Sequence, residues 1–147
     1  MVCLGNICRS PIAEGVLKHK AAESELDWTI DSAGTESYHI GEEPHKFSQK
    51  ICRQNGINIS GQKAMQFSKA DFAHYDKIYA MAKDVFTEIK RIGGPDADMS
   101  KVDYFLNERI AGSNESVPDP WYGSEDGYIA VYQMIDETCD AIIKRYK

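Results

Sequence analysis

One short stretch near the start of the chain combines a nucleophile with an anion-binding side chain. Cys3 and Arg9 are separated by five residues, and Ser10 and Pro11 follow directly. A strand that passes through a tight loop into a helix N-terminus forms an anion cradle, because backbone N–H groups and the helix dipole face the bound group. The guanidinium of Arg9 offers a planar set of donors that matches phosphate oxygens. The segment predicted to bind phosphate reads Cys3-Leu4-Gly5-Asn6-Ile7-Cys8-Arg9-Ser10.

The first residue of this loop is the candidate nucleophile. A free thiol is only a few per cent ionised at neutral pH, so we expect the helix N-terminus and Arg9 to stabilise the Cys3 thiolate. Ser10 is expected to donate a hydrogen bond to the sulfur, and Asn6 suits a left-handed turn that ties the loop to itself. The loop contains no lysine and no G-x-x-x-x-G-K-[ST] pattern, which excludes a nucleotide P-loop.

A second motif supplies the acid that a departing oxygen needs. Asp119 lies between Pro118 and Pro120, which should hold it in an extended and inflexible segment. An acid so placed contributes roughly 10²–10⁴ to a rate. Three aromatic residues in predicted loops could form the walls of a pocket for a phenyl ring: Tyr38, Trp121 and Tyr122.

Ordinary structural roles compete with these interpretations. Cys3 could be a buried strand residue, Arg9 a solvated charge and Asp119 part of a turn, but the two motifs together favour catalysis. Cys139 lies on an apolar helical stripe, which indicates a structural role. The four histidines have no metal-ligand spacing: His19, His39, His45 and His74. For His39 and His45, which flank the aromatic residues, a solvated loop role is favoured over substrate contact.

The elements that must position these residues alternate between strand and helix, which predicts an α/β fold with a parallel sheet covered on both faces. In such sheets the ligand lies beyond the carboxyl ends of the strands, where the Cys3 loop falls if the first strand ends just before it. Predicted strands are Met1–Val2, Trp28–Ile30, Ile78–Met81 and Val102–Phe105. Predicted helices start at Ser10-Pro11 and cover Phe47–Gln54, Lys83–Arg91 and the apolar stripe Tyr128, Tyr132, Ile135, Cys139, Ile142, Tyr146.

Composition limits the class of protein. The 147 residues suit one domain, and the formal net charge of −6 argues against sequence-independent nucleic-acid binding. An apolar run long enough for a membrane span and a signal-peptide pattern are both missing. Four cysteines without a C-x-x-C pair argue against a disulfide scaffold and a zinc site. We therefore expect a cytoplasmic protein without a cofactor or metal.

The motifs resemble the low-molecular-weight protein tyrosine phosphatases. Three segments carry the resemblance: Val2–Pro11, Asp31-Ser32-Ala33-Gly34 and Asp119-Pro120-Trp121-Tyr122-Gly123. The resemblance implies one domain over residues 1–147, a four-stranded parallel sheet flanked by helices on both faces, and metal-free hydrolysis of phosphotyrosine through a cysteinyl-phosphate. It makes Cys3 the nucleophile, Arg9 the ligand of phosphate and transition state, and Asp119 the general acid and then the base. Asn6 would shape the loop, Ser10 assist the thiolate, and Tyr38 contact the substrate.

The resemblance also bears on regulation and partners. It implies a reversible disulfide between Cys3 and Cys8 that protects the nucleophile from over-oxidation, although Cys8 could also be only a small loop residue. Phosphotyrosine proteins are the expected partners, with a tyrosine kinase among the candidates, and a monomer or weak dimer is the expected state. The chain departs from the family in three places. The family normally has several more strand residues before the loop cysteine than the two that precede Cys3. This chain also has His45-Lys46-Phe47 where Asp-Pro-Arg is frequent, and Ala82 where Asp often follows the third strand.

Three other functions remain open from the sequence. Arsenate reductases of this fold relay a disulfide through two further cysteines after the third strand, but residues 81–112 contain none. A protein-arginine phosphatase has a similar loop with Thr in place of Ile7, so the bulkier apolar side chain favours phosphotyrosine. A non-catalytic module that only holds phosphoproteins has no need for the acid Asp119.

Overall fold

A four-stranded sheet forms the centre of the molecule, with all strands parallel and in the order β2-β1-β3-β4. The strands are β1 (Val2–Cys3), β2 (Ala33–Gly34), β3 (Ile78–Ala80) and β4 (Val102–Tyr104). The computed structural model describes the backbone of residues 1–147 and every side chain except that of Tyr122. The predicted α/β fold with a four-stranded parallel sheet is confirmed.

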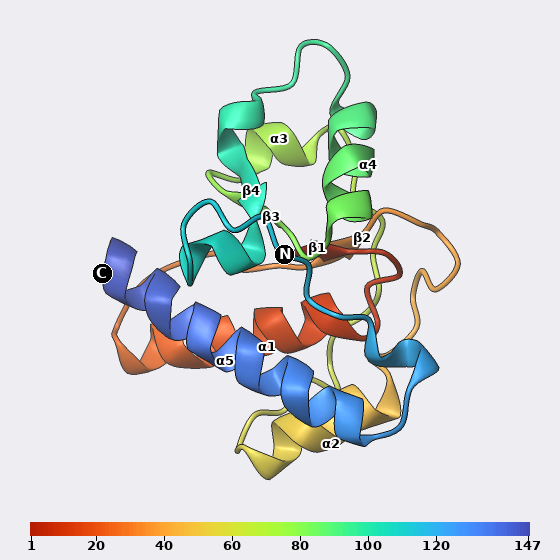
Figure 1. The fold of residues 1–147 in the computed structure, drawn as a ribbon, viewed down its shortest axis with the longest axis vertical. Helices are drawn as coiled ribbons and strands as arrows, with labels where there is room; N and C mark the ends of the chain where they lie inside the picture. Colours follow the sequence, from red (N-terminus) through yellow and green to blue (C-terminus); the bar gives the residue numbers. More distant parts are fainter.

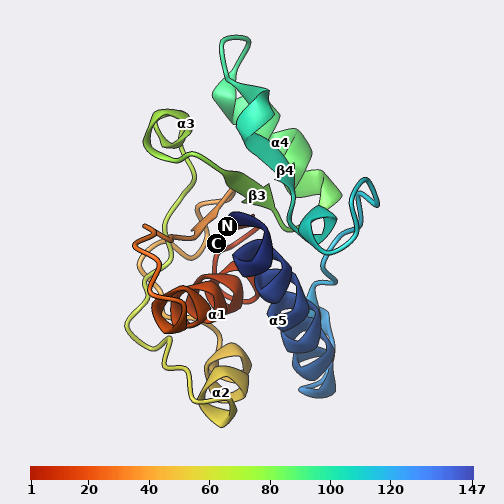
Figure 2. The same cartoon turned by 90° about the vertical axis from the view of Figure 1, so that its left-hand side faces the viewer.

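Helices cover both faces of this sheet, as Figures 1 and 2 show. One face carries α1 (Arg9–Glu23), α2 (Lys46–Gln54) and α5 (Asp126–Tyr146), and the other carries α3 (Asp71–His74) and α4 (Lys83–Gly93). Three short 3-10 turns complete the structure: η1 (Met99–Lys101), η2 (Phe105–Glu108) and η3 (Pro120–Tyr122).

Two hydrophobic cores follow from the alternation of side chains along each strand. Cys3 and Tyr79 point into the core beneath α1 and α5, whereas Val2 and Ile78 point into the core beneath α4. Both faces of β1 and β3 are therefore buried, which explains why these short strands read as continuous apolar runs.

The last helix has the predicted apolar stripe. Its residues Tyr128, Tyr132, Ile135, Cys139 and Ile142 are buried, and only Tyr146, at the end, is 38% exposed. This stripe packs α5 against α1 and the sheet, so Cys139 lies in the core as expected. None of the described helices combines the length and apolar character needed to cross a bilayer.

Two predicted element boundaries are wrong. Trp28–Ile30 is extended but is not a strand, and β2 instead forms at Ala33–Gly34. The reason is register: Val2 pairs with Ala33, so residues 28–30 lie beyond the start of β1 and have no neighbouring strand. Helix α1 begins at Arg9 with Cys8 as the N-cap, not at Ser10-Pro11, because the Ser10 hydroxyl is engaged in the loop instead of capping the helix.

Candidate active site

The loop of residues 4–8 connects the carboxyl end of β1 to the start of α1. No side chain caps the helix N-terminus, so the first backbone N–H groups of α1 are not used by a cap within the chain. Asn6 has a φ of 58°, the left-handed conformation that turns the loop back on itself. Gly34 permits this turn, because a Cβ there would lie 2.8 Å from the carbonyl oxygen of Leu4.

Cys3 lies at the base of this loop and is contacted by two donors. Its Sγ is 2.9 Å from Ser10 Oγ and accepts a hydrogen bond from the backbone N–H of Asn6 at 3.3 Å. The side-chain amide of Asn6 donates to Ser10 Oγ at 2.8 Å. Because that oxygen already accepts this bond, its own proton is free to point at the sulfur. The arrangement therefore suits a sulfur that carries negative charge.

A chain of polar side chains holds Asn6 in place. Its amide also donates to Ser32 Oγ at 2.9 Å, and Ser32 Oγ donates to Glu14 Oε1 at 2.7 Å. The other carboxylate oxygen of Glu14 accepts from Lys18 Nζ at 2.9 Å. Ser32 and Glu14 were not identified as site residues from the sequence. The signal was present, because Ser32 follows an extended segment and Glu14 lies one helical turn after Ser10.

Arg9 and Asp119 face each other at the same site. Arg9 is only 5% exposed and its Nη1 donates to the carbonyl oxygen of Val117 at 3.1 Å. Its Nη2 lies 3.8 Å from Asp119 Oδ2. The other carboxylate oxygen of Asp119 accepts from the backbone N–H of Trp121 at 3.0 Å. The Pro-Asp-Pro segment and Arg9 are thus joined, although more than 100 residues separate them in sequence.

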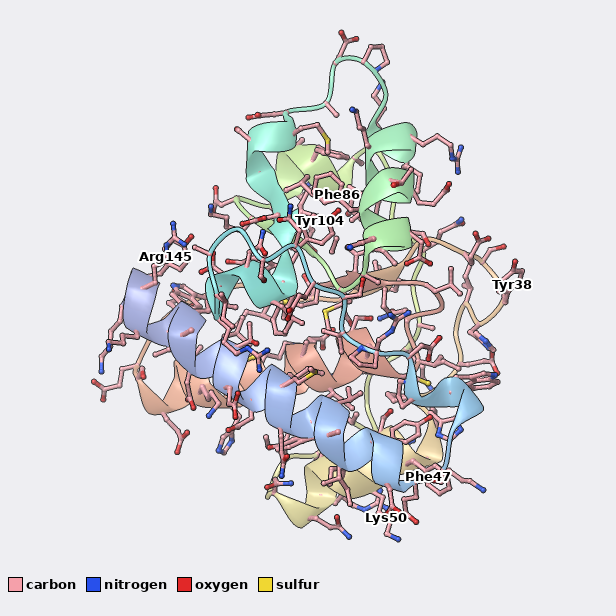
Figure 3. All side chains as sticks on the ribbon, in the orientation of Figure 1. Tyr38, Phe47, Lys50, Phe86, Tyr104 and Arg145 are labelled. Atoms are coloured by element: carbon pink, nitrogen blue, oxygen red, sulfur yellow. The ribbon has the colours of Figure 1, made fainter. Side chains whose placement is uncertain are left out.

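A small cavity of about 220 Å³ opens over the loop. Its walls include Tyr38 and Trp121, which are 73% and 43% exposed, and Figure 3 shows Tyr38 projecting from the edge of the molecule. His39 also lines the cavity, with its ring 5.8 Å from that of Trp121. The lining residues are Cys3, Leu4, Gly5, Ile7, Cys8, Arg9, Tyr38, His39, Asp119 and Trp121.

His45, which stands where the sequence differs from the frequent Asp-Pro-Arg pattern, contacts an aromatic side chain that lines this cavity. The His45 ring packs against Trp121 at 5.4 Å and stacks on Tyr128 at 5.3 Å, and its Nδ1 accepts from the backbone N–H of Phe47. Desolvation lowers the pKa of His45 from its ordinary value, with Lys46 adding to the effect. His45 therefore supports the Trp121 ring as a neutral aromatic side chain at neutral pH.

Cys8 lines the same cavity but has a different environment from Cys3. Its Sγ lies 3.5 Å from the hydroxyl of Tyr128, and both cysteines are free thiols in the structure. Burial raises the pKa of the Cys8 thiol to about 11, so it is protonated at neutral pH. Cys8 is thus placed near the loop without being primed as a second nucleophile.

The structure brings together the described residues that were predicted from the sequence to form the site. Cys3, Arg9, Asp119, the loop residues, Tyr38 and Trp121 all border one cavity or contact a residue that does. The side chain of Tyr122, predicted at the rim, lies outside the described part of the structure. Within the described residues, no three His, Cys, Asp or Glu side chains gather in a way that could hold a metal ion.

These features define an α/β protein in which a loop joins the carboxyl end of the first strand to an uncapped helix N-terminus beside a small cavity. A model of the "Low molecular weight phosphotyrosine protein phosphatase" family matches residues 1–147. The chain is 37% identical over 139 residues to the low molecular weight phosphotyrosine protein phosphatase of Schizosaccharomyces pombe, covering 92% of this chain and 88% of the relative. It therefore belongs to this family and is a phosphatase.

Solved structures agree with this assignment. The crystal structure of YfkJ from Bacillus subtilis matches with a TM-score of 0.88 at 35% identity, covering 98% of this chain and 90% of that one. A Drosophila arginine phosphatase matches with a TM-score of 0.91 at 31% identity, covering 99% and 95%. The YfkJ protein is named a low molecular weight protein-tyrosine-phosphatase, so the fold is similar to those of a named tyrosine phosphatase and a named arginine phosphatase.

Proposed function

We propose that this protein hydrolyses phosphotyrosine through a cysteinyl-phosphate intermediate, with the whole chain acting as one catalytic domain. The observation that carries the proposal is the placement of Cys3, Arg9 and Asp119 around one small cavity, with Ser10 Oγ 2.9 Å from the Cys3 sulfur. Uncatalysed hydrolysis of phosphate monoesters is among the slowest reactions known, so most of the acceleration must come from prearranged donors.

In the first half-reaction the Cys3 thiolate attacks phosphorus in line with the departing oxygen. The loop N–H groups and the guanidinium of Arg9 hold the phosphoryl oxygens and neutralise their charge. Asp119 gives its proton to the phenolic oxygen as the P–O bond breaks. The products of this step are free tyrosine side chain and phosphorylated Cys3.

In the second half-reaction Asp119 acts as the base. Its carboxylate removes a proton from water, the water oxygen bonds to phosphorus, and the P–S bond breaks. Ser10 then stabilises the departing thiolate by its hydrogen bond. Inorganic phosphate is released and Asp119 is again protonated, which restores the starting state.

The cavity walls favour an aryl phosphate. Tyr38 and Trp121 provide exposed aromatic surfaces that can contact a phenyl ring. Ile7 lines the cavity with an apolar side chain and packs beside Cys8 and Tyr128, where a guanidinium would gain no polar partner from it. Phosphotyrosine proteins are therefore the proposed substrates, and a cytoplasmic location is proposed with them.

The test is hydrolysis of a phosphotyrosine peptide in EDTA and a thiol reductant, with a phosphoarginine peptide as the second substrate. We expect turnover of the first, little turnover of the second, and loss of turnover in Cys3→Ser. Retention of phosphate binding by Cys3→Ser would show that the loop remains folded. Preference for phosphoarginine would refute the substrate assignment, and full turnover by Cys3→Ser would refute the mechanism.

A further inference from the structure

Helix α4 begins at a residue whose side chain cannot cap it. The N-cap position is Ala82, which has extended backbone angles, with φ −155° and ψ 165°, but no side-chain oxygen. The first N–H groups of a helix have no partner within the helix, so they need an acceptor from elsewhere. Here the backbone N–H of Lys83 donates to the hydroxyl oxygen of Ser116 at 3.0 Å, across 33 residues of sequence. A distant serine therefore serves as the cap of α4.

Ser116 lies in the segment that leads to the proposed general acid. The next residue, Val117, is held on both sides of its peptide unit. Its backbone N–H donates to the carbonyl oxygen of Met81 at 2.7 Å, and its carbonyl oxygen accepts from Arg9 at 3.1 Å. Asp119 follows two residues later and faces Arg9. The hydrogen bond that caps α4 is therefore also a tether between this helix and the acid segment.

Contacts at two successive residues control the direction of this segment as well as its position. The backbone bond to Val117 fixes one point but permits the segment to pivot about it, and the bond to Ser116 restrains that pivot. Pro118 has a fixed φ and restricts the conformation of the residue before it. A change of direction at Ser116 is therefore passed on to Asp119 instead of being absorbed between them.

The helix end of this tether is anchored in the core. Val85 and Ile89 of α4 have no exposed surface and pack with side chains of β3 and β4. The chain before Ser116 is different, because residues 110–112 and 114–115 are exposed. Exposed loops with few buried contacts are the more mobile parts of a protein. Ser116 therefore joins an exposed loop to a rigid part of the fold just before the acid.

We propose that Ser116 is a positioning residue for Asp119. Its hydroxyl ties the acid segment to the start of α4, where this chain has Ala82 instead of the Asp that is frequent in the family. The inference rests on the proposed function, because it concerns the step in which Asp119 protonates the departing phenolic oxygen. A displaced acid slows that step without weakening phosphate binding, since Arg9 and the loop N–H groups remain in place.

The test measures the first half-reaction by single-turnover phenol release, with enzyme in excess. Phenyl phosphate has a leaving group that needs a proton, whereas p-nitrophenyl phosphate has one that departs more readily without it. For Ser116→Ala we expect the maximal rate with phenyl phosphate to fall at least about threefold, with half-saturation changed less than about twofold. The rate with p-nitrophenyl phosphate should stay nearly unchanged, and Ser116→Thr should recover most of the loss. An equal loss with both substrates would overturn the proposal.

An isomeric variant separates the tether from the cap. Ser116→Ala combined with Ala82→Ser has the composition of the wild type and gives α4 a capping hydroxyl from its own N-cap residue. Relative to Ser116→Ala, we expect its urea unfolding midpoint to recover toward that of the wild type. Its single-turnover rate with phenyl phosphate should stay low, because the acid segment is still untied. Recovery of the rate together with the midpoint would show that Ser116 acts only as a cap and would overturn the proposal.

A double-mutant cycle with Asp119→Asn shows whether the effect passes through the acid. When Asp119→Asn is already present, Ser116→Ala should lower the phenyl phosphate rate by less than about 1.5-fold. The same loss in both backgrounds would overturn the proposal. A wild type that turns over neither substrate would refute the proposed function, and with it the step that Ser116 serves. An active wild type whose rates Ser116→Ala leaves unchanged would overturn this inference alone.

Discussion

The hydroxyl of Ser10 lies 2.9 Å from the sulfur of Cys3 and simultaneously accepts a hydrogen bond from the Asn6 amide. This pair of contacts directs the serine proton at the sulfur. It links the first turn of α1 to the last residue of β1, so that the fold itself positions the donor. The proposed chemistry depends on it in both half-reactions, first by favouring the attacking thiolate and later by stabilising it as a leaving group.

Removing this hydroxyl should slow both half-reactions. A hydrogen bond to a charged group contributes about 1.5–3 kcal/mol, so we expect Ser10→Ala to lower kcat roughly 10- to 100-fold. Ser10→Thr keeps the hydroxyl and should recover much of the rate. Steady-state hydrolysis of an aryl phosphate measures both variants. A Ser10→Ala enzyme as fast as the wild type would contradict the assigned role.

Asn6 contributes both a left-handed backbone conformation, with a φ of 58°, and side-chain hydrogen bonds. Two substitutions separate these contributions. Asn6→Gly and Asn6→Ala both remove the side-chain bonds to Ser10 and Ser32, so both should lose turnover. Only Ala carries the backbone cost of about 1–2 kcal/mol for a left-handed conformation. Urea unfolding should therefore show Asn6→Gly to be the more stable of the two by about that amount, and equal stabilities would argue against strain at this position.

The general-acid role of Asp119 can be tested by measuring how the rate loss in Asp119→Asn depends on the leaving group of the substrate. The loss of an acid should cost roughly 10²–10⁴ in rate for a phenol that needs a proton to depart. We expect a much smaller loss for an activated aryl phosphate such as p-nitrophenyl phosphate. Presteady-state rates for a series of substituted phenyl phosphates measure this, and an equal loss across the series would exclude Asp119 as the proton donor.

Oxidation should distinguish the two cysteines of the loop. Because burial raises the pKa of Cys8 to about 11, we expect peroxide to react first at Cys3. Cys8 should then form a disulfide with it, and a thiol reductant should restore activity. Cys8→Ser should instead lose activity irreversibly as Cys3 oxidises further. Peptide mass spectra without reductant would reveal the disulfide, and full recovery of oxidised Cys8→Ser would contradict its protective role.

The buried thiol of Cys52 should lower the free energy of unfolding at alkaline pH. It is fully buried, and burial raises its pKa from 9.0 to about 12. Above pH 9 the unfolded chain binds fewer protons than the folded one, so stability falls as pH rises toward 12. Between pH 8 and pH 10 this residue should account for about 1.4 kcal/mol of lost unfolding free energy. Urea unfolding of Cys52→Ala should show a pH dependence smaller by that amount, whereas an unchanged pH dependence would contradict the assignment.

Local sequence predicted much of the site because its chemistry is concentrated in one loop and one Pro-Asp-Pro segment. Cys3, Arg9 and Ser10 are neighbours in sequence, and short-range spacing was enough to group them. The polar chain from Asn6 through Ser32 to Glu14 was missed, because its members become neighbours only when the 31–34 segment pairs with β1.

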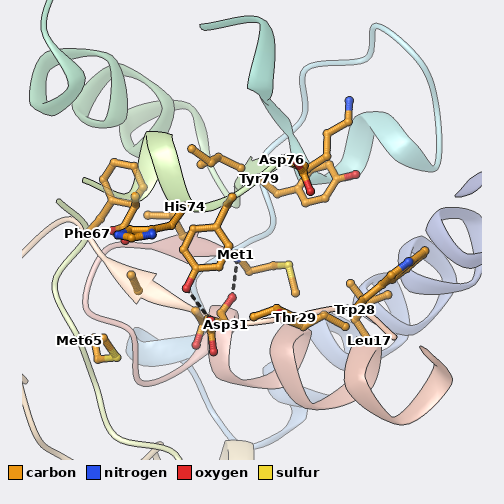
Figure 4. A pocket seen from close by; sticks show the side chains of 18 of the residues that line it. Met1, Leu17, Trp28, Thr29, Asp31, Met65, Phe67, His74, Asp76 and Tyr79 are labelled. Carbon is orange, nitrogen blue, oxygen red and sulfur yellow. Dashed lines mark hydrogen bonds between the residues drawn. The ribbon is translucent and has the colours of Figure 1, made fainter. Parts of the chain in front are cut away.

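The incorrect prediction of a strand at residues 28–30 also arises because pairing between distant segments is not visible in local sequence. Trp28-Thr29-Ile30 carries a residue pattern typical of a strand, but a strand also needs a partner. The neighbouring strand β1 covers Val2–Cys3 and pairs with Ala33–Gly34, so residues 28–30 have no partner strand among the described residues. The unpaired segment lines a cavity of about 660 Å³ (Figure 4), which sequence patterns alone did not indicate.

The central claim is that phosphate passes through a covalent bond to Cys3. Rapid-quench mass spectrometry of Asp119→Asn with p-nitrophenyl phosphate tests it most directly, because the variant should form the intermediate and hydrolyse it slowly. The account predicts one added phosphoryl group on the amino-terminal peptide, at Cys3, and none in Cys3→Ser. An unmodified peptide during turnover, or a phosphoryl group on any other residue, would contradict the account.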